Sequence, residues 1–447
     1  MAASRARGLG VVDASLIVVG SIVGAGIFFV SPSVAEHAGS PVAFIGSWLA
    51  GGLIALGGAL SNGELGGLFP RSGGEYVYLR EAYGPLFGFL SGWMSFWIGF
   101  PGSIAVLASG LGTTVAPMLG LSSAHAPVAI GAAAIVALTA INAWGLQPGK
   151  WTQNTLSSAK LLAFAGLLAL GLLFRHGHDG GFLPATPGGS SARGLAQSLV
   201  PVMFAYSGWN AATYVSGEMR DASRSLGRAL ALGTGLCIVL YLLVNVAYLR
   251  AMPIAELAAT PDPARVAATR LGGASAAAVL SPLIALCVLS SMQASVLVGP
   301  RIYHAMAADG LFFAPLGRLH ATTRVPLAAL LLQSAVALAQ LLTGSFEQLL
   351  TFATFAIVAF STLTVAAVVV LRVRRPEAPR AFRVPGGVIV PCLFVGVNAW
   401  VLWNVLASGA RAAYVGLAIV ATGVPAYAAF AAYAAYRKRA RPEETAR

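Results

Sequence analysis

Apolar residues gather in long stretches along the whole chain, and short polar or charged turns separate them. A helix needs about 20 apolar residues to cross a bilayer, and each of these stretches reaches or approaches that length. A single cleavable signal peptide does not explain a pattern that recurs to the end of the chain. The sequence therefore predicts an all-α integral membrane protein with twelve transmembrane helices. They are expected near residues 11–35, 41–69, 84–114, 126–145, 154–174, 195–217, 227–250, 272–304, 325–343, 348–371, 386–407 and 411–436.

Two of these expected helices, the first and the sixth, are interrupted in the middle by small and polar residues. The first contains Gly20, Gly24 and Gly26, and the sixth contains Ser207 followed by Gly208. A glycine inside a helix costs about 1 kcal/mol relative to alanine. Close packing of helices explains an isolated pair such as Gly20 and Gly24 well. Two interrupted helices at corresponding places in the chain favour a binding site instead.

The spacing of the two interruptions predicts how the chain is organised. Helices five spans apart correspond to each other in an inverted repeat of five plus five helices, and their breaks then lie at the same depth. No linker separates two domains, so residues 1–447 are expected to form one transmembrane domain. Repeat one covers about 11–174, repeat two about 195–371, and two additional helices follow at about 386–436.

A helix that breaks inside the membrane leaves polar backbone groups without partners, and protein or a ligand must satisfy them. The amides after the first break, from Gly24 to Ile27, suit a carboxylate because they begin a new half-helix. The carbonyls near Ile22 and Phe204 suit an ammonium group. A carboxylate beside an ammonium is an α-amino acid, so the breaks predict an amino acid site.

Charge and composition narrow the class of protein further. The chain is 57% hydrophobic and 10% charged, which excludes a water-soluble enzyme. Its formal net charge is +13, but most of the cations flank the expected helices on one side. The positive-inside rule then puts both termini in the cytoplasm, with the protein in the cytoplasmic membrane. The excess charge therefore indicates topology and contact with lipid, and we expect no nucleic acid partner.

Three stretches in order, GSIVGAGIFFVSPSVAEHAGSP, NGELGGLFPRSGGEYVYLREAYGP and FAYSGWNAATYVSGEM, resemble the amino acid–polyamine–organocation transporters. The chain is most similar to bacterial members of the L-type amino acid transporter branch. The resemblance implies a LeuT-type fold, alternating access, and an amino acid held between broken helices one and six. It also implies which residues bind the substrate. The carboxylate is expected at Gly24, Ala25 and Gly26, the amine at the carbonyls of Ile22 and Phe204, and the outer gate at Phe204 and Asn210.

The chain departs from this family in two places. Ser207 stands where these transporters commonly have glycine, and its hydroxymethyl group narrows the pocket, which favours a small or medium substrate. Eukaryotic members also have a cysteine that links them to a heavy-chain partner. The corresponding stretch here, LGLSSAHAP, has none, so we expect no disulfide-linked heavy chain.

Lys160 is the one cation that falls well inside an expected helix, since the others lie near helix ends or in the turns between helices. A lysine near a helix end often extends to the interface, and position alone favours that interpretation. The resemblance implies another role, in which the ammonium replaces the sodium ion of sodium-coupled relatives. It would then bind carbonyls near Gly20 and a hydroxyl such as that of Ser290, and transport would not need sodium.

No acidic residue lies near the middle of an expected helix, so a neutral substrate is favoured over a cationic one. Exchange of neutral L-amino acids is the simplest mode, and a proton-coupled permease of the same fold is the alternative. An intramembrane enzyme or a scaffold is more remote, because the spans contain no nucleophile with a base. We expect no cofactor and no metal site. His176 and His178 are close together, but they lie in a glycine-rich loop.

Overall fold

The structure, a computed structural model, describes residues 8–440 except residue 25 and the segments 174–191, 344–345 and 408–410. Within these ranges the regular elements are helices, and one isolated bridge joins Leu9 to Met219. Eight helical stretches in the described part are long and apolar enough to cross a membrane. Their outer surfaces are apolar too, as at Val136 and Leu232, which are 56% and 61% exposed. This pattern is typical of a multi-pass membrane protein.

The first half of the chain contains the first broken helix and the helices that pack around it. Ser40 caps the long second expected span by accepting a hydrogen bond from the amide of Ala43 at 3.3 Å, and Pro41 follows in the first helical position. The helices are α1 (Val11–Ile22), α2 (Gly26–Phe29), α3 (Ser31–Ala38), α4 (Pro41–Leu68), α5 (Glu75–Tyr83), α6 (Pro85–Met94), the π-helix η1 (Ser95–Gly99), α7 (Phe100–Met118), α8 (Ala126–Ala143) and α9 (Leu146–Leu173).

The second half begins with the second broken helix. Its elements are α10 (Ala192–Ala205), the 3₁₀ helix η2 (Ala211–Glu218), α11 (Ala222–Ala251), α12 (Ile254–Ala259), α13 (Pro263–Ala278), α14 (Leu280–Val298), α15 (Pro300–Ala308), the 3₁₀ helix η3 (Ala314–Gly317), α16 (Leu327–Thr343), α17 (Phe346–Arg374), α18 (Ile389–Ala407) and α19 (Arg411–Ala440). Both interruptions that the sequence predicts are present, one between α1 and α2 and one between α10 and η2.

The stretch 251–271, which separates the expected helices 227–250 and 272–304, is itself largely helical and contains α12 and most of α13. The Asp262 carboxylate accepts a hydrogen bond from the amide of Arg265 at 3.1 Å, and Pro263 occupies the first turn, so local capping starts α13 within a polar stretch. The eighth expected span, 272–304, also begins later in the structure. It corresponds to α14 and α15, which start at Leu280.

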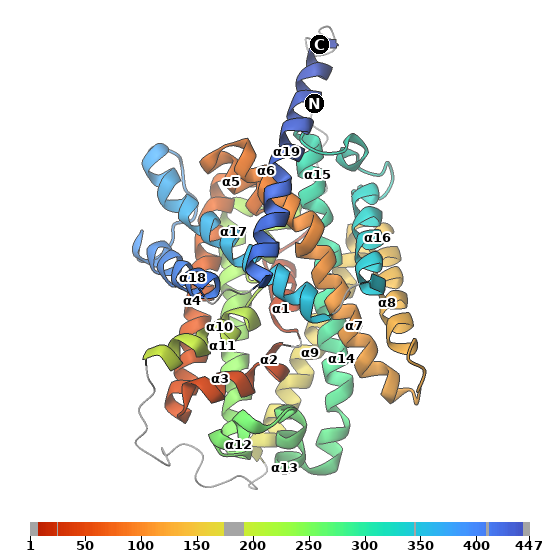
Figure 1. Cartoon of the computed structure of the whole chain (residues 1–447), viewed down its shortest axis with the longest axis vertical. Coiled ribbons are helices and arrows are strands. Elements are labelled where there is room, and N and C mark those ends of the chain that lie inside the picture. Colours follow the sequence, from red (N-terminus) through yellow and green to blue (C-terminus); the bar gives the residue numbers. More distant parts are fainter. Residues whose placement is uncertain (1–7, 25, 174–191, 344–345, 408–410, 441–447) are drawn as a thin grey trace.

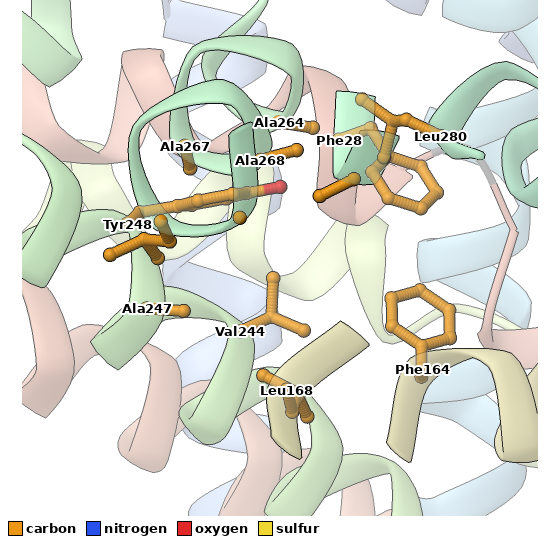
Figure 2. A pocket seen from close by; sticks show the side chains of 13 residues that line it. Phe28, Phe164, Leu168, Val244, Ala247, Tyr248, Ala264, Ala267, Ala268 and Leu280 are labelled. Atoms are coloured by element: carbon orange, nitrogen blue, oxygen red, sulfur yellow. The ribbon is translucent and has the colours of Figure 1, made fainter. Parts of the chain in front are cut away.

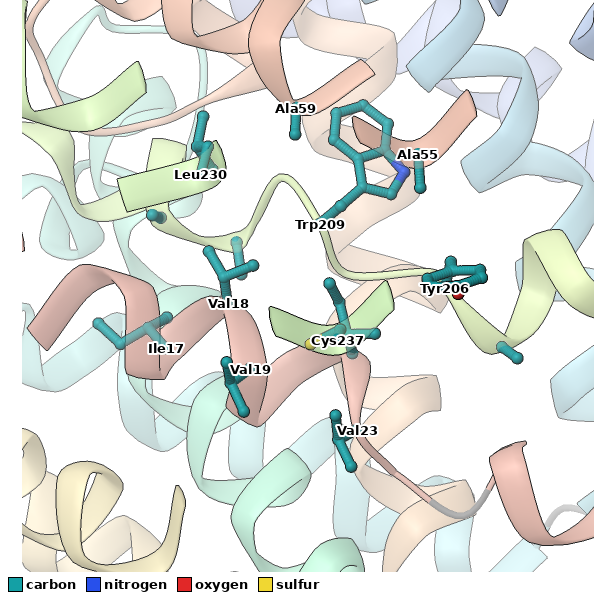
Figure 3. Close-up of a cluster of buried hydrophobic side chains, with 14 of the residues drawn as sticks. Ile17, Val18, Val19, Val23, Ala55, Ala59, Tyr206, Trp209, Leu230 and Cys237 are labelled. Carbon is teal, nitrogen blue, oxygen red and sulfur yellow. The ribbon is translucent and has the colours of Figure 1, made fainter. Parts of the chain in front are cut away.

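The two broken helices lie in the centre of the molecule. Helix α1 packs against α9, α11 and α14, and α11 also packs along α4. Figure 1 shows α2, α3, α12 and α13 toward one end of the molecule and α5, α15 and the last turns of α19 toward the other. The core lies between these helices. Figure 3 shows Val19 and Val23 of the first broken helix and Tyr206 of the second beside Cys237 of α11, and all four side chains are buried.

Candidate functional site

The first break exposes backbone carbonyls that side chains from other helices satisfy. Helix α1 ends at Ile22, and Val23 has non-helical angles (φ −79°, ψ 79°). The Lys160 ammonium donates to the carbonyl of Gly20 at 3.2 Å and to that of Val23 at 2.7 Å. The Ser291 hydroxyl donates to the same Gly20 carbonyl at 2.7 Å. A cation from α9 and a hydroxyl from α14 thus fix the broken end of α1.

The structure decides between the two interpretations of Lys160. Its side chain is fully buried (0% exposed), so it does not extend to the interface and that interpretation is wrong. The ammonium lies where the resemblance implies, beside Gly20. The hydroxyl that shares its carbonyls belongs to Ser291, whereas Ser290 lies against the Ser157 hydroxyl at 3.2 Å. The hydroxyl beside the Lys160 ammonium therefore belongs to Ser291, the residue that follows the expected Ser290.

Tyr241 of α11 connects the two breaks directly. Its hydroxyl lies 2.8 Å from the carbonyl oxygen of Ile22 and 3.1 Å from that of Ala205. One hydroxyl proton is therefore shared between the ends of α1 and α10, and the two helix ends cannot separate without loss of this contact. The Ile22 carbonyl also accepts from the amide of Gly24 at 2.8 Å, so it already has two donors.

The glycines near the first break permit close approach of other elements. A side chain at Gly20 would overlap Gln153, so this glycine serves packing against α9. A Cβ at Gly24 would lie 3.2 Å from the Ser291 hydroxyl oxygen, and one at Gly26 would lie 3.3 Å from Cα of Ala205. Gly24 thus adjoins Ser291, which bonds to the first break, and Gly26 adjoins Ala205 at the end of α10. Ala25, the remaining residue expected to bind the carboxylate, lies outside the described residues.

The second break is satisfied largely by its own backbone. The amide of Ser207 donates to the carbonyl of Phe204 at 3.0 Å, and the amide of Ala211 donates to that of Gly208 at 3.1 Å. Gly208 has φ +99°, and a Cβ there would lie 2.8 Å from Cβ of Ser21. The two breaks therefore touch each other, and only glycine fits at this contact. The Phe204 side chain is partly exposed.

Asn210 is expected at the outer gate, but its hydrogen-bond partners lie elsewhere. Its side-chain amide is buried and donates to a Glu75 carboxylate oxygen at 2.8 Å and to the Tyr214 hydroxyl at 3.0 Å. Glu75 begins α5, so these bonds connect Asn210 to the end of the molecule that carries α5 and α15.

Comparison with known proteins gives the family. A model of the amino acid permease family matches residues 9–431. The chain belongs to the amino acid permease family. The match confirms the resemblance to the amino acid–polyamine–organocation superfamily. Members of the family are transporters, so this protein is an amino acid transporter of the membrane and not an enzyme.

Individual relatives of this permease include both bacterial and animal proteins. It is 29% identical over 422 residues to the serine/threonine exchanger SteT of Bacillus subtilis, covering 94% of this chain and 95% of that one. It is 30% identical over 430 residues to the human large neutral amino acids transporter small subunit 2, covering 94% and 79%. Identity to the human Asc-type amino acid transporter 1 is 29% over 430 residues, covering 94% and 80%.

Sequence reasoning missed three functional candidates of this permease: Tyr241, Ser291 and Glu75. Tyr241 lies in an apolar helix, and a buried tyrosine hydroxyl usually finds a hydrogen-bond partner. Its position in the sequence therefore indicates a residue that bonds to a polar group inside the protein. Ser291 follows Ser290 directly, so only the rotation of α14 distinguishes them. Glu75 lies in the conspicuous motif GGEYVYL, but its burial depends on packing between distant helices. His176 and His178 lie outside the described residues.

A cavity lies beside the second break, between α4, α10, α17 and α18. Its volume is about 50 Å³, well below the roughly 300–1,000 Å³ of typical small-molecule sites, so it has room for no more than a short group. One part of its lining is polar and the rest is apolar, so it suits a short uncharged side chain. The polar side chains are those of Ser207, Asn210, Ser361 and Asn398, and the larger apolar ones are those of Ile54, Met203, Trp209, Ile357, Val358 and Phe394.

A second cavity lies between α2, α9, α11 and α13, as Figure 2 shows. Phe28 and Phe164 line it and stack with ring centroids 5.6 Å apart. Tyr248 provides the single polar side chain of its lining. This cavity has no charged group to bind a carboxylate or an ammonium, so the breaks remain the candidate site for the charged ends of an amino acid.

Proposed function

We propose that this permease exchanges small to medium neutral L-amino acids across the cytoplasmic membrane by alternating access, without sodium. The observation that carries the proposal is the Lys160 ammonium on the carbonyls of Gly20 and Val23. A resident cation supplies the positive charge that these carbonyls attract, so a sodium ion is not needed there. The printed names of the relatives, a serine/threonine exchanger and transporters of neutral amino acids, support exchange and a neutral substrate.

The substrate is proposed to lie between the two breaks. Its carboxylate binds the amides of Gly24, Ala25 and Gly26, once the Gly24 amide leaves the carbonyl of Ile22 to which it donates in the structure. That change also frees one lone pair of the Ile22 carbonyl, so the amine binds near the carbonyls of Ile22 and Phe204. Each carbonyl oxygen has two lone pairs, and that of Phe204 accepts one bond from Ser207 in the structure. The substrate side chain extends toward the cavity at Ser207, and the polar part of that lining favours a short, uncharged group.

The architecture that goes with this mechanism is the twelve-helix, LeuT-type arrangement with a five-plus-five inverted repeat. Breaks after Ile22 and after Ala205, in contact with each other, support it. We assign both termini, and the end of the molecule that carries α5 and α15, to the cytoplasm, because the basic turns favour that side. None of the three cysteines lies in the stretch LGLSSAHAP, since Cys237 and Cys287 are buried within helices and Cys392 belongs to the apolar helix α18, and this supports a transporter without a disulfide-linked heavy chain.

Reconstitution tests the function directly. Purified protein in proteoliposomes is supplied with a panel of radiolabelled amino acids in sodium-free buffer, with and without unlabelled amino acid inside. We expect uptake of a small neutral amino acid that requires internal substrate and is unchanged by added sodium. Uptake that requires a sodium gradient contradicts the proposal, and so does an absence of uptake for every amino acid.

Proton coupling is the second candidate, and one observation favours it. Glu75 is a buried carboxylate at the end of the molecule assigned to the cytoplasm, and the sequence alone gave no such candidate. Uptake into vesicles that contain no amino acid, driven by an inward proton gradient, identifies a proton-coupled permease. Uptake that depends on internal amino acid at equal pH on both sides identifies an exchanger.

A further inference from the structure

Glu75 is a junction between three elements that are distant in sequence. It is the first residue of α5, and 4% of its surface is exposed. One of its carboxylate oxygens accepts hydrogen bonds from the side-chain amide of Asn210 at 2.8 Å and from the hydroxyl of Ser361 at 3.1 Å. Asn210 directly precedes η2, and Ser361 belongs to α17. The Glu75 carboxyl group therefore holds α5, the second broken helix and α17 together.

No cation accompanies this buried carboxylate among the described residues. The titratable groups near it are the phenols of Tyr78 in α5 and Tyr214 in η2, with Tyr303 of α15 next to Tyr214. Helix α6 has no titratable residue, α17 contributes Ser361, and Arg301 of α15 is paired with Glu218 at 3.0 Å. The site therefore offers the carboxylate neutral donors and no balancing charge.

A second buried glutamate of the same chain shows the contrast. Glu64 of α4 is 1% exposed, and its carboxylate binds Arg372 at 2.6 Å and Arg380 at 3.3 Å. A buried carboxylate is costly unless it is paired in this way. Glu75 lies between the apolar spans Pro41–Leu68 and Pro85–Met118, and burial raises its pKa to about 7, although the hydrogen bonds from Ser361 and Asn210 oppose the rise.

The surroundings of Glu75 close one side of the second broken helix. The amide of Gly73 donates to the carbonyl of Tyr214 at 3.3 Å, and the Ser216 hydroxyl donates to the carbonyl of Arg71 at 2.9 Å. The amide of Gly217 donates to the Ser72 hydroxyl at 3.2 Å. The loop before α5 thus covers η2 along its length. If the proposed alternating access is correct, this contact must open to release substrate to the cytoplasm.

We propose that Glu75 is a proton-binding site that the permease occupies when its cytoplasmic side is closed and empties when that side opens. This inference rests on the proposed function. In the closed state a proton neutralises the buried carboxyl group, whereas in the open state water surrounds the group and the carboxylate gives the proton to the solution. The hydrated carboxyl has an ordinary pKa of about 4.3. The closed state therefore binds the proton more tightly, and acid favours closure.

The sign of the pH effect follows from this difference. Below about pH 7 the closed state is protonated, so each opening must release a proton, and the opening equilibrium falls by up to about tenfold per pH unit until the open state is protonated too. Above that pH both states are ionised, and opening no longer depends on pH. We expect exchange to be fastest in weakly alkaline buffer and to slow as the pH falls through about 7.

The experiment measures amino acid exchange in proteoliposomes with equal pH inside and outside, from about pH 5.5 to about pH 8.5, where neutral amino acids keep their zwitterionic form. Equal pH removes any proton gradient and makes the orientation of the protein unimportant. We expect the wild-type rate to fall on the acid side, and Glu75→Gln to be slow and independent of pH. Glu377→Gln, in an exposed cytoplasmic turn, is the control and should keep the wild-type profile.

Ser361→Ala gives a second readout that does not require loss of the carboxyl group. It removes one hydrogen-bond donor to the ionised Glu75 carboxylate, so the midpoint, the pH at which the exchange rate is half of its maximum, should rise. If Glu75 had only a structural role, Ser361→Ala would not change the pH at which the exchange rate is half of its maximum. A flat wild-type profile, a wild-type profile in Glu75→Gln, or an unshifted midpoint in Ser361→Ala overturns the proton site while exchange itself stands. Loss of exchange at every pH in the wild type contradicts the proposed function instead.

Discussion

The two helix breaks solve the same physical problem in different ways. At the first break, donors from three other helices satisfy the freed carbonyls: Lys160 of α9, Ser291 of α14 and Tyr241 of α11. At the second break, turns of the local backbone satisfy the carbonyls of Phe204 and Gly208, and Gly208 provides the required angle. The first break therefore depends on distant side chains, one of them charged, whereas the second depends on its own conformation. Among the residues that the structure describes, Tyr241 is the one whose side chain bonds to both breaks.

Removal of the charge at the first break is expected to have the largest effect. Lys160→Ala leaves the carbonyls of Gly20 and Val23 without their ammonium donor, and a hydrogen bond to a charged group contributes about 1.5–3 kcal/mol. We expect exchange to fall on the order of 100-fold or more, because each 1.4 kcal/mol is about tenfold. Uptake into proteoliposomes and the Tm in detergent measure the loss.

Lys150→Ala is the matched control for this charge. Lys150 also lies in α9, and it pairs with Asp13 at 3.3 Å, with 14% and 16% of the two side chains exposed, so loss of the ammonium leaves a carboxylate that water still reaches. We expect a change of less than about fivefold in this variant. Equal losses in the two lysine variants would mean that the first break does not depend on its buried cation.

The second break is tested through its backbone. Gly208→Ala puts a side chain on a residue with φ +99° and against Ser21, and strain of this kind costs about 1–3 kcal/mol before the contact is counted. We expect exchange to fall about 10- to 100-fold. Gly235→Ala, where a Cβ meets no atom within 4 Å, should leave the rate and the Tm nearly unchanged. A normal rate in Gly208→Ala would show that the local turn is not what holds this break.

Tyr241→Phe tests the hydroxyl group that bonds to both breaks. The change keeps the ring and removes the hydroxyl that lies near the carbonyls of Ile22 and Ala205, which costs about 1 kcal/mol. We expect a loss of about three- to tenfold in exchange, with a lower apparent affinity for substrate. Tyr248→Phe in the same helix is the control, since that hydroxyl is buried and has no hydrogen-bond partner within the described ranges. Equal effects of the two changes would argue against a bridge at Tyr241.

The smallest effect is expected at the hydroxyl beside Lys160. Ser291→Ala removes one neutral donor from the Gly20 carbonyl, and the ammonium remains, so a loss of about two- to fivefold in exchange is expected. Ser290→Ala should change the rate by less than about twofold, because its hydroxyl contacts Ser157 and not the broken helix. The opposite order in the exchange assay would restore Ser290 as the residue that completes the Lys160 site.

The sequence by itself determined the features that depend on local pattern. Apolar stretches predict spanning helices because each helix must satisfy its own backbone in lipid. Glycine and serine inside two of them predict the breaks, since these residues weaken a helix wherever they occur. A single lysine within a span was visible for the same reason. The polar stretch at α13 misled the prediction, because its capping by Asp262 formed a helix that apolarity did not indicate.

Only the tertiary structure decided which groups meet. Adjacent residues on a helix point about 100° apart, so the rotation of α14 alone directs Ser291 to the break and Ser290 away from it. Glu75 meets Asn210 and Ser361 across 135 and 286 residues of chain, and no local pattern encodes such a contact. The burial of Lys160 also depends on how α9 packs against α1 and α14. A buried polar group costs free energy unless it has a partner, and the packing of helices that are distant in sequence decides which partner it meets.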